Sequence, residues 1–134
     1  MEGLEFFKNM KRIINTKNAP AAIGPYSQAV EANGTLYISG QLPVNPASGK
    51  IETTDVTEQT EWVFKNIKAI LDEAEYSLES VVKHTVFLSD MSLFGAMNEV
   101  YKTVYQSDCP ARSTFAVKEL PLGALVEIET IAVI

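Results

Sequence analysis

Three charged side chains near the C-terminus have the types and spacing that a hydrolytic site for a small organic acid needs. Arg112 lies in the segment PARSTFAV, and Glu127 and Glu129 lie in GALVEIETIAV, which follows it. A guanidinium can hold a carboxylate through two parallel hydrogen bonds, and an ionised glutamate can orient and deprotonate a water molecule. Together, these groups suit a carboxylate substrate that is attacked by water.

The same residues also permit a structural interpretation. If both segments are strands, Arg112 and Thr114 share one face of the first, and Glu127 and Glu129 share one face of the second. The sequence does not fix which face each pair takes, so Arg112 and Glu127 either form an ion pair or flank a cavity. For Glu129 we favour a structural role, such as an ion-pair partner, over a second pocket carboxylate.

Length and charge exclude several classes of protein. The chain has 134 residues, which suits one domain with one core. Acidic residues outnumber basic ones by 17 to 11, and the basic residues are scattered, so we expect no nucleic-acid partner. No apolar stretch reaches the ~18 to 20 residues of a membrane helix, and the N-terminus is unlike a secretion signal. We therefore expect a cytoplasmic protein with no membrane contact.

The chain has one cysteine and one histidine. Cys109 cannot form an internal disulfide bond, and together with His84 it supplies too few ligands for a standard zinc site, so we predict no metal. Cys109 precedes Pro110 and is expected to be a loop residue. His84 lies within a β-prone segment, and we favour a buried structural histidine over a catalytic base.

The first half of the chain predicts an extension, a strand and a hairpin. Residues 1–10 are interpreted as an N-terminal extension, because Met10 precedes the β-prone KRIINT and could itself be a start site; the single domain is then 11–134. Asn33-Gly34 divides the segment Tyr26–Gly40 into two β-prone parts, a pattern typical of a hairpin. The prolines and glycine that follow predict a long loop up to Lys50.

The second half predicts two helices among three strands. Asp55 begins an amphipathic helix that runs to about Glu75, and Ser89-Asp90 can cap a second helix after the strand SVVKHTVFL. The closing strands are Arg112–Val117 and Leu125–Val133. This order predicts an α+β fold in which both helices cover one face of a single sheet. Strands that are apolar on both faces favour an oligomer that covers the other face, although an ordinary polar outer face stays an alternative.

Four segments, in order, resemble motifs of the YjgF/RidA family. They are NAPAAIGPYSQAV, SGQLPVNPASGK, FGAMNEVY and PARSTFAVKELPLGALVEIETIAV, and they span nearly all of the chain after Met10. The chain is identified as a member of this family by these motifs. The resemblance implies a chorismate mutase-like α+β fold, a mixed sheet with two helices on one face, and a barrel-like homotrimer with a ligand pocket at each subunit interface.

The resemblance also implies an activity. It is the hydrolytic deamination of enamines and imines, 2-aminoacrylate (2-iminopropanoate) and 2-iminobutanoate, to 2-oxo acids and ammonia, with no cofactor. Pyridoxal phosphate enzymes supply such substrates. The alternative is a non-catalytic trimer that binds a 2-oxo acid or a related metabolite as a sensor, and a ribonuclease role attributed to some relatives fits poorly with the acidic composition.

The resemblance assigns the family's site positions to individual residues of this sequence. The family's carboxylate-binding arginine corresponds to Arg112, and the acid that holds the attacking water corresponds to Glu127. The chain departs from the family archetype at Thr114, where the archetype has a cysteine; a threonine hydroxyl can still hydrogen bond to an oxo acid, but substrate preference is put in doubt. The resemblance implies these substrate-binding residues: Tyr26, Gly40, Asn98, Arg112 and Thr114.

Overall fold

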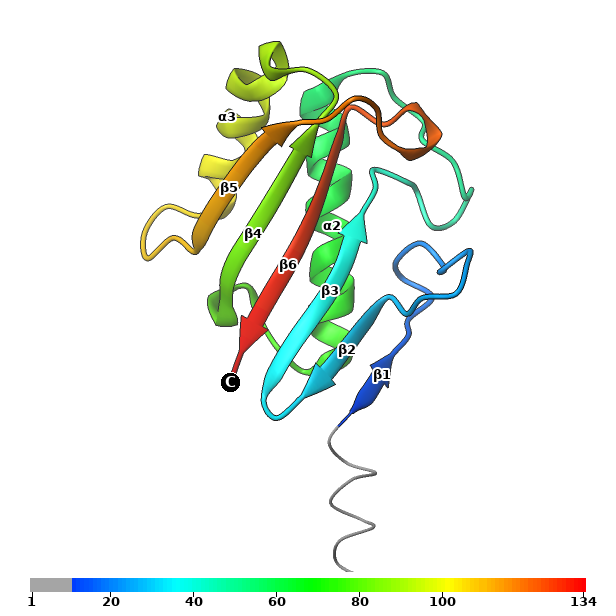
Figure 1. Ribbon diagram of the computed structural model, residues 1–134, viewed down its shortest axis with the longest axis vertical. Helices are drawn as coiled ribbons and strands as arrows, with labels where there is room; N and C mark the ends of the chain where they lie inside the picture. Colours follow the sequence, from blue (N-terminus) through cyan, green and yellow to red (C-terminus); the bar gives the residue numbers. More distant parts are fainter. Residues whose placement is uncertain (1–10) are drawn as a thin grey trace, which may run out of the picture.

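A six-stranded mixed sheet with two helices on one face forms the body of the protein (Figure 1). The computed structural model describes residues 11–134, and the predicted extension, residues 1–10, lies outside them. The strand order is β1-β2-β3-β6-β4-β5, and only the β4–β5 pair is parallel. The strands are β1 (Arg12–Ile14), β2 (Ala29–Ala32), β3 (Thr35–Gln41), β4 (Val81–Leu88), β5 (Ala111–Ala116) and β6 (Val126–Val133).

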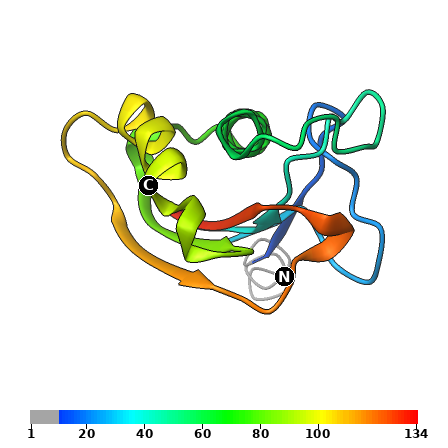
Figure 2. The same ribbon diagram turned by 90° about the horizontal axis from the view of Figure 1, so that it is seen from above.

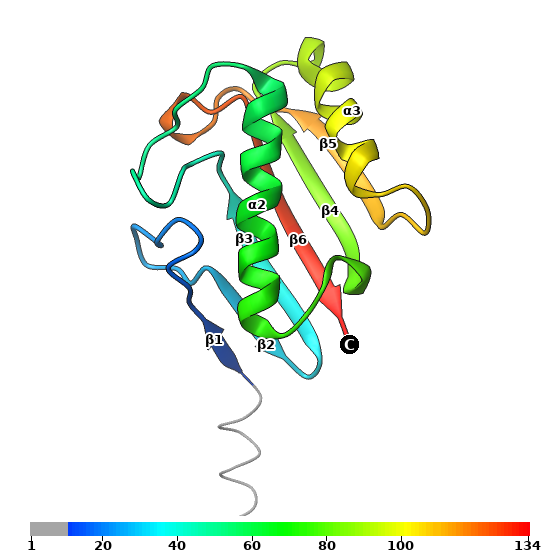
Figure 3. The same cartoon turned by 180° about the vertical axis from the view of Figure 1, so that it is seen from behind.

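The two helices lie on the same side of the sheet, as Figure 2 shows in a view along its edge. They are α2 (Val56–Ala74) and α3 (Phe94–Val104). From behind, α2 runs along the middle strands and α3 lies over β4 and β5 (Figure 3). The predicted α+β class, the mixed sheet and the one-sided placement of both helices are therefore confirmed. No helix within residues 11–134 has the length and apolar character needed to span a membrane.

The predicted hairpin is confirmed between β2 and β3. Asn33 (φ 52°) and Gly34 (φ 77°) are both left-handed, as a tight two-residue turn between twisted strands requires. The hairpin is shorter than predicted, because regular pairing begins only at Ala29. Tyr26 therefore lies in the loop before β2, where its N–H donates to the carbonyl of Gly24 at 2.8 Å. This loop is held by the side chain of Gln28, which hydrogen bonds to four backbone groups.

The predicted start of each helix and the predicted end of α2 are confirmed. The Asp55 carboxylate accepts the N–H of Glu58 at 3.1 Å, and α2 stops at Glu75, which is left-handed with φ 64°. Asp90 accepts the N–H of Ser92 at 2.8 Å and caps a 3-10 turn, Met91–Leu93, that leads into α3. Burying each large apolar side chain of these helices stabilises the fold by about 1.5–3 kcal/mol. The fully buried ones include Val63, Ile67, Ile70, Leu71 and Met97.

The two faces of the sheet differ in what covers them. The helix-covered face is buried, as the alternating burial along β4 and β6 shows. The open face combines large exposed rings, Tyr37 at 51% and Phe115 at 53%, with the carboxylates of Glu127 and Glu129. It is therefore neither an ordinary polar face nor wholly apolar.

Candidate active site

Arg112 and Glu127 lie on opposite faces of the sheet. Arg112 pairs with His84 on β4, and His84 pairs with Thr130 on β6, so these three side chains point to the buried face under the helices. Glu127 is three residues from Thr130 along β6, and alternation turns it to the open face. A direct ion pair between Arg112 and Glu127 within one chain is therefore excluded.

The guanidinium of Arg112 is held by α3. Its Nη1 donates to Asn98 Oδ1 at 2.7 Å, and its Cζ lies 4.6 Å from the ring centroid of Tyr101 and 5.4 Å from that of Phe94. No carboxylate lies within 4 Å of it in the part of the chain that the structure describes. The hydroxyl of Thr114, two residues along the same strand face, is buried and has no hydrogen-bond partner within residues 11–134. This side of the site can take an anionic ligand.

The motifs did not single out Tyr101 as part of the site. It is buried in the core, as a packing residue of α3 would be. The signal that could have found it is spacing, because Asn98 and Tyr101 are three residues apart and so face the same way on a helix.

The second half of the site is a hollow of about 540 Å³ on the open face of the sheet. It brings together three predicted site residues, Tyr26 from the loop before β2, Gly40 from β3 and Glu127 from β6. Arg112, Asn98 and Thr114 do not line it. The full set of lining residues is Ile23, Tyr26, Ser39, Gly40, Leu42, Pro121, Leu122, Glu127 and Glu129.

Position 40 requires a glycine because the side chain of Glu127 lies close to its backbone. A Cβ atom at this position would lie 2.8 Å from Glu127 Oε2 and 2.9 Å from Glu127 Cδ, inside van der Waals contact. The backbone of Gly40 is not left-handed, so conformation alone would permit another residue. The absence of a side chain therefore leaves the room that the Glu127 carboxylate occupies.

Glu127 is a half-buried carboxylate whose charge is unfavourable where it lies. Burial raises the pKa of its carboxyl above the usual value, and repulsion by Glu129 raises it further. Within residues 11–134 neither glutamate forms an ion pair. Glu129 thus lines the same hollow as Glu127, and the ion-pair role that the sequence favoured for it has no partner in the described chain. A raised pKa makes the Glu127 carboxylate a better proton acceptor.

His84 is a structural residue, as predicted. It is fully buried, its Nδ1 lies 3.0 Å from Thr130 Oγ1, and its Nε2 lies 2.7 Å from the hydroxyl of Tyr105. Burial lowers the pKa of its imidazole to about 4, and the nearby charge of Arg112 acts in the same direction. The ring is therefore neutral at physiological pH and places no second positive charge beside Arg112.

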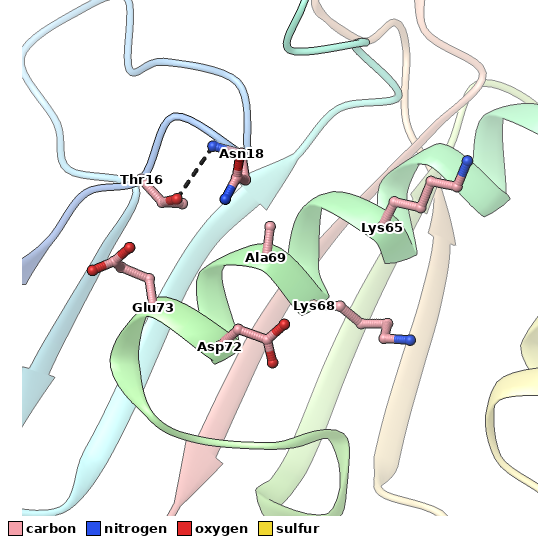
Figure 4. Close-up of a pocket in the computed structure, with 7 residues that line it drawn as sticks. All are labelled: Thr16, Asn18, Lys65, Lys68, Ala69, Asp72 and Glu73. Carbon is pink, nitrogen blue, oxygen red and sulfur yellow. Dashed lines mark hydrogen bonds between the residues drawn. The ribbon is translucent and has the colours of Figure 1, made fainter.

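A separate hollow of about 470 Å³ lies between α2 and the loop after β1 (Figure 4). Its polar groups carry both signs of charge, from Lys65 and Lys68 and from Asp72 and Glu73. None of the predicted site residues lines it. We therefore do not regard it as the catalytic site.

The described residues contain no cluster that would bind a metal ion. Within residues 11–134 no group of three or more His, Cys, Asp or Glu side chains has the required arrangement. Cys109 is a free, exposed thiol in the loop after α3, which confirms the loop position expected for it.

Comparison with known proteins places the chain in one family. The sequence pattern of the Endoribonuclease L-PSP family matches residues 16–134. A 2-iminobutanoate/2-iminopropanoate deaminase of Capra hircus is 51% identical over 92% of this chain and 90% of its own, and a RutC family protein of Pyrococcus horikoshii is 50% identical over 92% and 98%. The crystal structure of E. coli TdcF with bound serine superimposes with a TM-score of 0.87 at 42% identity, over 92% of this chain and 98% of TdcF. The chain therefore belongs to this family, the YjgF/RidA family.

Proposed function

We propose that this protein hydrolyses 2-imino acids, such as 2-iminopropanoate and 2-iminobutanoate, to 2-oxo acids and ammonia. The observation that carries the proposal is the half-buried Glu127 carboxylate, which lies beside Gly40 without an ion-pair partner in residues 11–134. Relatives about half identical to this chain bear the name of that deaminase activity. A structure of a further relative is described with bound serine, which has the same carboxylate as the proposed substrates.

The proposed reaction uses water as its only other reactant. Glu127 takes a proton from a water molecule, and the oxygen forms a bond to the imine carbon while the C=N electron pair moves to nitrogen. Glu127 returns its proton to the nitrogen of this carbinolamine. The hydroxyl group then loses its proton, and its oxygen forms the C=O bond as the C–N bond breaks, which leaves a 2-oxo acid and ammonia. Because an imine already hydrolyses in water, orientation and one positioned base are enough to accelerate it, and the proposal includes no cofactor.

Arg112 binds the carboxylate of the substrate in this proposal. Its guanidinium is held by Asn98 through one nitrogen, and the other nitrogens have no acceptor within residues 11–134. They can donate two parallel hydrogen bonds to a carboxylate. Thr114, on the same strand face, offers a buried hydroxyl without a partner in the described residues, and this hydroxyl can donate to the oxo or imino end of the substrate.

The two halves of the site meet between copies of the chain in the proposed assembly. Arg112 faces the helices near the edge strand β5 and Glu127 faces the open side of the sheet, so one substrate cannot bridge them through the sheet of a single chain. A homotrimer that covers the open face would bring Arg112 of one copy to the hollow of the next. The exposed rings of Tyr37 and Phe115 support an interface on this face.

Two other candidates are less well supported. A sensor for 2-oxo acids would need Arg112 but has no evident need for a second, negatively charged group, so the Glu127 carboxylate favours an enzyme. The family description as an endoribonuclease suggests RNA cleavage. The net charge of −6 and the scattered basic residues do not favour binding of a phosphate backbone.

The test generates 2-iminobutanoate in place with an amino-acid oxidase and traps it with semicarbazide. An imine deaminase competes with the trap, so the semicarbazone should form more slowly when the wild-type protein is present. The Arg112→Ala variant, matched in concentration and folding, should leave the trapping rate at its background value. An unchanged trapping rate with folded wild-type protein would exclude deaminase activity.

A further inference from the structure

Tyr101 joins the guanidinium of Arg112 to the aromatic core. The centroid of its ring lies 4.6 Å from Arg112 Cζ. It also lies 5.8 Å from the centroids of both Phe64 and His84, and 5.3 Å from that of Tyr105. The side chain is only 6% exposed. Since the core fixes the ring on α3, the ring is a rigid platform for the guanidinium.

The guanidinium is held by an aromatic ring and by one hydrogen bond. Its Cζ lies over the ring of Tyr101, and Asn98 accepts a hydrogen bond from Nη1 at 2.7 Å. Both residues lie on α3, three positions apart, so one rigid element supplies both contacts. Nε and Nη2 have no acceptor within residues 11–134, so they can donate to a ligand.

We propose that Tyr101 is a positioning residue for the carboxylate of the substrate. It does not touch the substrate; its ring face fixes the plane of Arg112, so that the free edge meets the carboxylate with both hydrogen bonds aligned. A guanidinium free to rotate would lose part of this two-point geometry. The inference rests on the proposed function for the identity of the carboxylate ligand, and it goes beyond that function by assigning a role to a core residue.

The hydroxyl of Tyr101 provides a matched control. It is buried and has no hydrogen-bond partner within residues 11–134, whereas the hydroxyl of Tyr105 contacts His84. The face of the ring, and not its hydroxyl, is therefore the part that positions Arg112. Tyr101→Phe keeps this face, while Tyr101→Leu keeps an apolar side chain but removes the face.

The experiment titrates 2-oxobutanoate and its uncharged amide, 2-oxobutanamide, into wild type, Tyr101→Phe and Tyr101→Leu. We expect Tyr101→Leu to bind 2-oxobutanoate roughly 10-fold more weakly, within the range of a cation–π contact, with the amide unaffected. In the deaminase assay KM should rise by a similar factor and kcat should change less. Tyr101→Phe should match wild type in each measurement. A merely structural role would weaken the acid and the amide alike.

Three results would overturn the inference: wild-type affinity for 2-oxobutanoate in Tyr101→Leu, an equal loss in Tyr101→Phe, or no binding of 2-oxobutanoate by the wild type. Failure of the proposed function is a different result, in which the wild type binds 2-oxobutanoate in a Tyr101-dependent manner but hydrolyses no imine.

If Tyr101→Leu does not fold, fluorinated phenylalanines at position 101 keep the shape of the ring and weaken its negative face. Affinity for 2-oxobutanoate should then fall stepwise with the number of fluorine atoms. Constant affinity across the series would overturn the inference.

Discussion

Replacing Glu127 with glutamine separates catalysis from binding and stability. The change keeps the size of the side chain but removes the negative charge that the proposed mechanism needs to accept a proton. Turnover should fall by roughly 10²-fold or more, the scale of a lost general base, which corresponds to about 2.7 kcal/mol in the activation barrier. Binding of 2-oxobutanoate should persist, because the Arg112 grip is untouched.

The stability of the same variant tests the geometry of the site. Loss of a buried ion pair would lower the free energy of unfolding by about 3–5 kcal/mol. Glu127 has no such pair within residues 11–134, and burial and Glu129 both disfavour its charge. Glu127→Gln should therefore be at least as stable as wild type.

The assay combines semicarbazide competition, calorimetric titration of 2-oxobutanoate and thermal unfolding on one preparation of Glu127→Gln. A pH profile adds an independent readout, because the raised pKa of Glu127 places the acid limb of kcat/KM above the usual range of a glutamate. Removing the neighbouring charge with Glu129→Gln should move this limb to lower pH. Full activity in Glu127→Gln, or an acid limb that does not move in Glu129→Gln, would refute the reasoning.

Three further predictions follow from the same geometry. Arg112→Lys should lose most activity, because an ammonium cannot form the planar two-point grip; near-normal kcat/KM would contradict this. Gly40→Ala should reduce activity in a folded protein, because its Cβ would lie 2.8 Å from Glu127 Oε2; wild-type turnover would show that the carboxylate moves without consequence. The pKa of His84 is about 4 when folded and 6.5 unfolded. As the pH falls from 6.5 to about 4, this histidine is protonated in the unfolded chain but stays neutral in the folded protein. The free energy of unfolding therefore falls by up to about 3 kcal/mol over this pH range. His84→Gln should flatten the pH dependence of the free energy of unfolding in this range, measured by denaturant titration. An unchanged slope would contradict the lowered pKa of His84.

Much of the fold was accessible from the sequence because its signals are local. Asn33-Gly34 specifies a two-residue turn by its left-handed backbone, and Asp55 specifies a helix start by the N–H that it accepts. Strand boundaries set by pairing were less accurate. Tyr26 was assigned to the hairpin, but it lies in the preceding loop, since the register with β3 begins at Ala29.

The site was predictable in its members but not in its arrangement. Alternation placed Arg112 with Thr114 and Glu127 with Glu129, and both pairings are confirmed. The relation between the two pairs depends on the register of β4 with both β5 and β6, which no local pattern encodes. The role proposed for Tyr101 was harder to predict, because its three-residue spacing from Asn98 indicates a shared helix face but does not by itself separate it from a packing residue.

The central claim is that one copy supplies Arg112 and another supplies Glu127. The most direct test mixes equal amounts of Arg112→Ala and Glu127→Gln, each inactive alone, and allows the subunits to exchange. If each site combines residues from two copies, random mixing makes about a quarter of the sites intact, so about a quarter of wild-type deaminase activity should return. If both residues act within one chain, every chain carries a defect and mixing restores no activity. A mixture no more active than its separate components would therefore contradict the account.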